Sequence, residues 1–181
     1  TTVSGGRQAY LCPNGSSMRR GKKQHSEKIL AILKSLQSAE DVQSAMLPWR
    51  GKLTPREEAI LLNEQHTDLK ASMDLFSWFK SQENYVSNVF KYNIMFKVLG
   101  KYRKWEFLRQ LWDEMLKEEH VCPTNVTYST IIDAYSKAGL KIEALKWFEG
   151  MDDEKTRPDE VTLNTVLNLY KSVVNLLLIY T

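Results

Sequence analysis

The feature that most constrains the fold is one apolar pattern that occurs three times along the chain at a nearly constant distance. Within residues 89–171 each copy places apolar side chains at positions i, i+3, i+4 and i+7, which together form one face of a short helix. The second copy begins 36 residues after the first, and the third begins 35 residues after the second. The copies are Tyr92, Met95, Phe96 and Leu99, then Tyr128, Ile131, Ile132 and Tyr135, then Leu163, Val166, Leu167 and Tyr170. Such a period predicts an all-α fold, an α-solenoid of antiparallel helix hairpins that bury their apolar faces against their neighbours.

Capping residues, glycines and prolines divide the chain into units. Residues 54–57 predict a helix start, with a Thr cap, a proline in the first turn and a glutamate three residues after the cap. Gly139 is expected to end a helix in the left-handed conformation, whereas the matching turn of the preceding unit has no glycine. Pro123 and Pro158 prevent the helices before them from continuing. The predicted segments are a basic leader (1–26), a divergent hairpin (27–52), a degenerate repeat (53–88), a repeat (89–124), a second repeat (125–159) and an incomplete repeat with an atypical apolar tail (160–181).

The first 26 residues differ in composition from the rest of the chain. No acidic residue precedes Glu27, while arginines, lysines and serines are frequent. This composition is typical of an organellar transit peptide, and a basic disordered tail of any other origin explains it equally well. We expect the segment to be poorly ordered and dispensable for folding, because it holds few large apolar residues.

Charge and cysteine content limit the function classes only loosely. A net charge of +3 permits a polyanionic partner without requiring one. Cys12 and Cys122 are too few and too far apart to form a disulfide framework, which favours a reducing compartment. The apolar run 173–180 is shorter than the roughly 20 residues that a membrane helix needs, so no membrane is expected as partner.

The unit 125–159 is the clearest in the chain. Residues 126–139 have the pattern of a first helix and turn, residues 143–151 that of a second helix, and Arg157-Pro158-Asp159 closes the unit. This succession resembles the pentatricopeptide repeat family. Residues 89–124 match with one extra residue before the closing proline, residues 160–171 match as half a repeat, and residues 53–88 match as a degenerate copy. The tetratricopeptide repeat is the alternative, but its Trp, Leu-Gly and Tyr pattern is absent and its period of about 34 residues is too short.

The resemblance implies that the first helices line a concave surface that binds single-stranded RNA, one base per repeat, with two side chains contacting each base. The base-reading positions would be Asn93 with Thr124, Ser129 with Asp159, and Asn164 as the first member of a third pair. The Ser–Asp pair is similar to those that the family uses for guanine, and Asn–Thr suggests a pyrimidine. Glu57 and Asn88 match no familiar pair, so the degenerate unit is expected to contribute packing. Bases would stack on Phe90, Val126 and Val161, and phosphates would meet Lys101 and Lys137.

Other reactive residue types favour neither catalysis nor a cofactor. His25, His66 and His120 are scattered, and a single His–x–Cys step without a second pair is no metal site. We therefore expect no enzyme, no metal and no cofactor. Tryptophans in the second helices are expected in the core, while the places of Trp49 and Trp105 stay open. The core is expected to include Tyr92, Phe96, Ile131, Ile132, Leu145, Phe148 and Met151.

Two functions of different classes remain. The first is sequence-selective RNA binding in organellar RNA metabolism, in splicing, processing or stabilisation of transcripts, with the chloroplast favoured over the mitochondrion. The second is a helical-repeat scaffold that binds a protein partner without direct RNA recognition. An apolar stripe in residues 160–181 also favours a homodimer or a protein partner at the exposed repeat end.

Overall fold

The computed structural model describes residues 26–153 and 156–179, and over them the chain is helical without strands, which confirms the predicted all-α class. The expected leader lies, apart from Ser26, outside the described residues. The elements are α1 (Glu27–Ser38), α2 (Val42–Met46), the short 3-10 helix η1 (Leu47–Trp49), α3 (Pro55–Gln65), α4 (Leu69–Lys80), α5 (Val89–Lys101), α6 (Trp105–Met115), α7 (Asn125–Lys137), α8 (Lys141–Asp153) and α9 (Glu160–Ile179).

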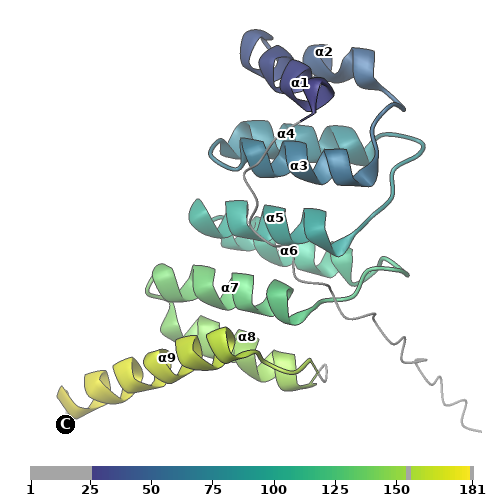
Figure 1. Ribbon diagram of the computed structural model, residues 1–181. Helices are drawn as coiled ribbons and strands as arrows, with labels where there is room; N and C mark the ends of the chain where they lie inside the picture. Colours follow the sequence, from purple (N-terminus) through teal and green to yellow (C-terminus); the bar gives the residue numbers. More distant parts are fainter. Residues whose placement is uncertain (1–25, 154–155, 180–181) are drawn as a thin grey trace, which may run out of the picture.

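The helices form hairpins that stack in chain order into a solenoid (Figure 1). Within each hairpin the first helix packs on the second, as α3 does on α4, α5 on α6 and α7 on α8. The first helices also pack on one another, α1 on α3, α3 on α5, α5 on α7, and α7 on α9. They therefore form one continuous layer of the molecule, with the second helices α4, α6 and α8 beside it.

Local sequence explains where these helices begin and end. Thr54 and Thr124 each form a reciprocal capping box, and Asn88 accepts the backbone N–H of Lys91 at the start of α5. Gly139 ends α7 with a φ of 81°, which confirms the expected left-handed conformation. The matching turn after α5 uses Arg103 instead, with a φ of 55°.

An aromatic network joins consecutive hairpins through the core. Tyr92 packs edge-on against Phe76 of the preceding unit at 5.8 Å between ring centroids. Trp112 meets Tyr128 of the following unit at 5.2 Å, and Trp105 stacks on Tyr135 at 4.3 Å. Trp78, Trp112 and Trp147 pack in the core as predicted, and Trp49 and Trp105 also pack against it.

The predicted core is confirmed with one correction. Tyr92, Phe96, Ile131, Ile132, Leu145 and Met151 are buried. Phe148 was expected to be largely buried but is half-buried. Its counterpart Trp112 is also half-buried, so this position lies at the margin of the second-helix face.

Candidate nucleic-acid interface

A groove of about 710 Å³ runs along the layer of first helices and is lined by α5, α7 and α9. Its floor contains Gly100 of α5 and Ala134 of α7. A Cβ atom added at Gly100 would lie 2.5 Å from the Cβ of Ala134, so the two helices approach each other closely here. The small residues thereby fix the spacing of neighbouring first helices at the groove.

Three large apolar side chains are exposed at equivalent positions near the starts of α5, α7 and α9. Phe90 is 66% exposed, Val126 is 53% exposed and Val161 is 70% exposed. Val161 lines the groove, whereas Phe90 and Val126 are not part of its lining. Scattered exposed apolar residues are ordinary, but exposure at one repeated position on successive helices is a feature of the repeat itself.

The residues expected to be the first member of each base-reading pair lie three residues after these apolar side chains. Ser129 lines the groove and donates its hydroxyl hydrogen to the Val126 carbonyl at 3.2 Å. Asn93 is half-buried, and its buried Oδ1 has no hydrogen-bond partner among the described residues. Asn93 lies one helical turn before Lys97, as Ser129 lies one turn before Asp133, and both later residues line the groove. The spacing therefore puts Asn93 and Ser129 on equivalent faces of α5 and α7.

The residues expected to be the second member of each base-reading pair act as helix caps of the following unit. Thr124 Oγ1 accepts the backbone N–H of Thr127 at the start of α7. Asp159 Oδ1 accepts the backbone N–H of Thr162 at 2.8 Å and its hydroxyl at 2.7 Å. Both bonds go to one carboxylate oxygen, and the second oxygen takes no part in the cap. The capping bonds hold each of these side chains at the start of the helix that follows.

The two expected phosphate-binding lysines lie in the groove in different surroundings. Lys137 pairs with Asp133 one turn earlier at 2.6 Å. Lys101 has its Nζ 5.3 Å from the centre of the Tyr102 ring. Lys97 and Arg103, which the sequence analysis did not single out, line the same groove. Aligning the two repeats position by position would have found them, because Lys97 corresponds to Asp133 and Arg103 to Gly139.

A buried ion pair beneath the start of α5 was also missed. Lys91 is fully buried and lies 2.6 Å from Glu58 of α3. It also donates to the Val86 carbonyl at 2.6 Å and lies 3.9 Å from the centre of the Tyr85 ring. Burial raises the pKa of Glu58 and lowers that of Lys91, although their mutual attraction opposes both shifts. The pair joins α3 to α5 two residues before Asn93.

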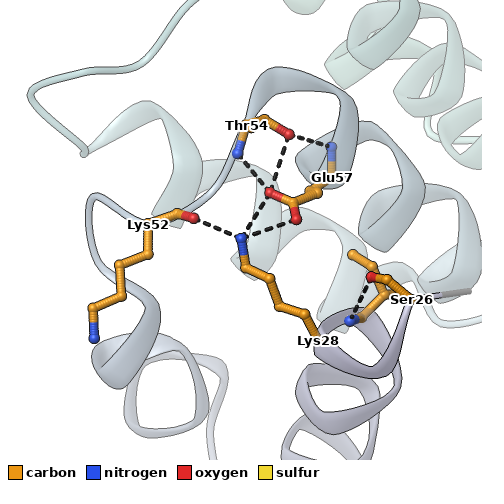
Figure 2. A network of polar contacts seen from close by, with 6 residues as sticks. Ser26, Lys28, Lys52, Thr54 and Glu57 are labelled. Atoms are coloured by element: carbon orange, nitrogen blue, oxygen red, sulfur yellow. Dashed lines mark hydrogen bonds and ion pairs between the residues drawn. The ribbon is translucent and has the colours of Figure 1, made fainter.

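Glu57, the equivalent of a base-reading position in the degenerate unit, is occupied by contacts within the fold (Figure 2). It accepts the backbone N–H of Thr54 at 2.8 Å and forms an ion pair with Lys28 of α1 at 2.9 Å. Lys28 also donates to the Lys52 carbonyl at 2.7 Å. These contacts tie α1 to the start of α3.

Asn164, the remaining residue expected to contact a base, is exposed on α9. Within the described part of the chain, no group of three His, Cys, Asp or Glu side chains is placed to hold a metal ion. None of the helices described is both long and apolar enough to cross a bilayer.

Comparison with known proteins gives consistent matches. The model of the PPR repeat family matches residues 87–137 and 123–171. The chain is 46% identical over 143 residues to pentatricopeptide repeat-containing protein At3g23020 of Arabidopsis thaliana, covering 79% of this chain and 17% of that protein. It is 40% identical over 160 residues to At1g73710 of the same organism, covering 88% and 16% respectively. The chain thus spans less than a fifth of each of these relatives.

A solved structure has the same architecture. The pentatricopeptide repeat protein PPR10, in complex with an 18-nt psaJ RNA element, superimposes with a TM-score of 0.60 and 25% identity. The match covers 79% of this chain and 22% of that one. Further relatives from Oryza sativa, Zea mays and Arabidopsis thaliana are named chloroplastic proteins, and one from Arabidopsis thaliana is named mitochondrial.

Proposed function

Because the chain belongs to the pentatricopeptide repeat family, we propose that it binds single-stranded RNA with base selectivity in an organelle. Its role would be in splicing, processing or stabilisation of transcripts. Membership of this family argues for binding and against catalysis. The chloroplastic names of several relatives favour the chloroplast over the mitochondrion.

The observation that carries this proposal is the paired pattern on the first helices. An exposed apolar side chain and, three residues later, a polar side chain recur on α5, α7 and α9. A base can stack on the apolar group, which contributes about 1–3 kcal/mol for an aromatic platform, while the polar group contacts the base edge. An ordinary solvent-exposed helix surface does not explain why Phe90, Val126 and Val161 are exposed at the same position of successive repeats.

The base preference follows from the donors and acceptors at each pair. Asp159 can accept hydrogen bonds from N1 and N2 of guanine through the oxygen that does not cap α9, with Ser129 as the other member of the proposed pair. At the other pair, the combination of Asn93 with Thr124 favours a pyrimidine.

The scaffold alternative has its own observation. Leu163, Leu167 and Tyr170 of α9 are between 44% and 56% exposed, while their counterparts in α5 and α7 are buried. Such a face suits a protein partner. Salt separates the two functions, because RNA affinity falls steeply with added salt whereas apolar helix packing does not.

The experiment that tests base selectivity replaces Asp159 by Asn. Asn caps helices about as well as Asp, so α9 should stay intact. The amide replaces an acceptor-only group by one that also donates, so the preference at one RNA position should shift from guanine towards adenine by roughly 1–2 kcal/mol. Competition among RNAs that vary at a single base measures this shift.

The matched control is Asp133→Asn, the same chemical change inside the groove at a residue that is not one of the proposed base-reading positions. It frees Lys137 from its ion pair, so it should strengthen the binding of all RNAs alike. Lys137→Ala should weaken all RNAs alike. An equal loss for every base in the Asp159→Asn variant would favour the scaffold function.

A further inference from the structure

Neighbouring repeats present the same three positions to the groove with different charges. The positions of Lys97, Lys101 and Arg103 recur 36 residues later as Asp133, Lys137 and Gly139. All except Gly139 line the groove. The comparison between these two sets isolates what is particular to residues 89–124.

In α7 the two charged side chains that line the groove neutralise each other. Lys137 lies 2.6 Å from Asp133, and this spacing of four residues is a favourable pair on a helix surface. In α5 the aspartate is replaced by Lys97, so two lysines occupy the same spacing and repel each other. Among the described residues, neither Lys97 nor Lys101 nor Arg103 forms an ion pair with a carboxylate.

The backbone adds a second unfavourable contribution at the same place. Arg103 has a φ of 55°, a region that side chains with a Cβ rarely adopt, whereas the neighbouring repeat has Gly139 at a φ of 81°. Folding therefore tolerates both like-charge repulsion and a strained arginine at the end of α5. Strain and repulsion that the neighbouring repeat avoids point to a binding role for these side chains.

We propose that Lys97 and Arg103 extend the phosphate contact already expected of Lys101 into a three-cation site for the backbone of a single-stranded nucleic acid. This inference rests on the proposed function and adds that the two repeats contribute unequally to binding the nucleic-acid backbone. The unit 89–124 anchors the strand through three cations, one of which is a guanidinium able to bind two phosphate oxygens. The unit 125–159, with its internal Lys137–Asp133 pair, contributes less to anchoring.

The test gives residues 89–124 the side chains that residues 125–159 have at the same positions. Arg103→Gly and Lys97→Asp are made in the 181-residue chain, with Lys70→Asp on α4, outside the groove lining, as the control for altered net charge. Affinity is measured against salt concentration with two probes, a short single-stranded RNA of randomised sequence and inorganic polyphosphate. Thermal unfolding of each variant is followed in parallel.

We expect Arg103→Gly to raise the melting temperature and yet weaken the binding of both probes about fivefold. Lys97→Asp should lower the affinity for both probes about tenfold. Each lost phosphate contact should flatten the dependence of log affinity on log salt by about 0.7 for RNA. Lys70→Asp should leave the salt dependence almost unchanged.

The two probes separate this inference from the proposed function. If the variants bind RNA and polyphosphate as the Lys70→Asp control does, the inference is overturned, whereas base selectivity is decided separately by the competition among RNAs that differ at one base. If the wild-type protein shows no preference among RNA bases but loses polyphosphate affinity in Arg103→Gly, the phosphate site stands without the proposed function. A wild-type protein that binds neither probe overturns the inference.

Discussion

Glu57 shows how a residue at a repeated position can be diverted to folding. Burial acts to raise its pKa, but hydrogen bonds from Thr54 and Lys28 outweigh it and hold the pKa below its usual range. The charged form therefore stabilises the fold, fully above the unfolded-state pKa of about 4.3, and this stabilisation is lost as the pH falls through the folded value.

We expect Glu57→Gln to lower the free energy of unfolding by about 0.5–1 kcal/mol at neutral pH, since Gln keeps the capping bond but loses the ion pair. The difference from wild type should shrink towards zero in strongly acidic solution. Urea unfolding at several pH values measures it, with Glu149→Gln on the exposed side of α8 as the control. A difference that does not change with pH would show that the charge of Glu57 is not responsible.

Contact between helices α5 and α7 depends on the absence of one methyl group. Gly100→Ala would force its Cβ against Ala134, which must move together with its helix. The expected loss is about 1–3 kcal/mol from overpacking, larger than the gain of up to about 1 kcal/mol in helix propensity. Gly150 in α8 has open space around it, so Gly150→Ala should be neutral or stabilising. Thermal unfolding of the two variants measures the difference in stability. Equal effects would show that the close approach of α5 and α7 does not cause the loss.

The parts of the fold that could be predicted from the sequence are those that depend on residues close together in the chain. Helix starts such as Thr54 and turns such as Gly139 depend on residues close in the chain, so their patterns predict them directly. The Glu58–Lys91 pair joins residues 33 apart in the sequence. The next two units have threonine at the position of Lys91, so no local or repeated pattern indicates the pair. The groove charges are intermediate, because Lys97 and Arg103 stand out only when two repeats are compared position by position.

At the scale of the whole molecule, equivalent residues differ because the helices around them differ. Phe96 and Ile132 are buried, and Phe96 packs against Trp112 of α6 at 6.1 Å between ring centroids, whereas Leu167 is 56% exposed on α9. Its neighbours Leu163 and Tyr170 are each 44% exposed on the same stripe. The fourth residue of the predicted stripe, Val166, is buried together with Leu169, and α9 packs on α7 and α8. The repeat pattern thus predicts an apolar stripe in every unit, but not what covers it.

An uncovered stripe of this kind favours association of the 181-residue chain with itself. We expect a concentration-dependent increase in molecular mass in sedimentation experiments, which Leu167→Glu should reduce by placing a charge in the centre of the stripe. Because Leu167 is exposed, the variant should change the free energy of unfolding at low protein concentration by less than about 0.5 kcal/mol. Lys171→Glu, at an exposed position on the same helix, controls for the added negative charge. A wild-type chain that remains monomeric at every concentration would show that apolar exposure on α9 is tolerated without association.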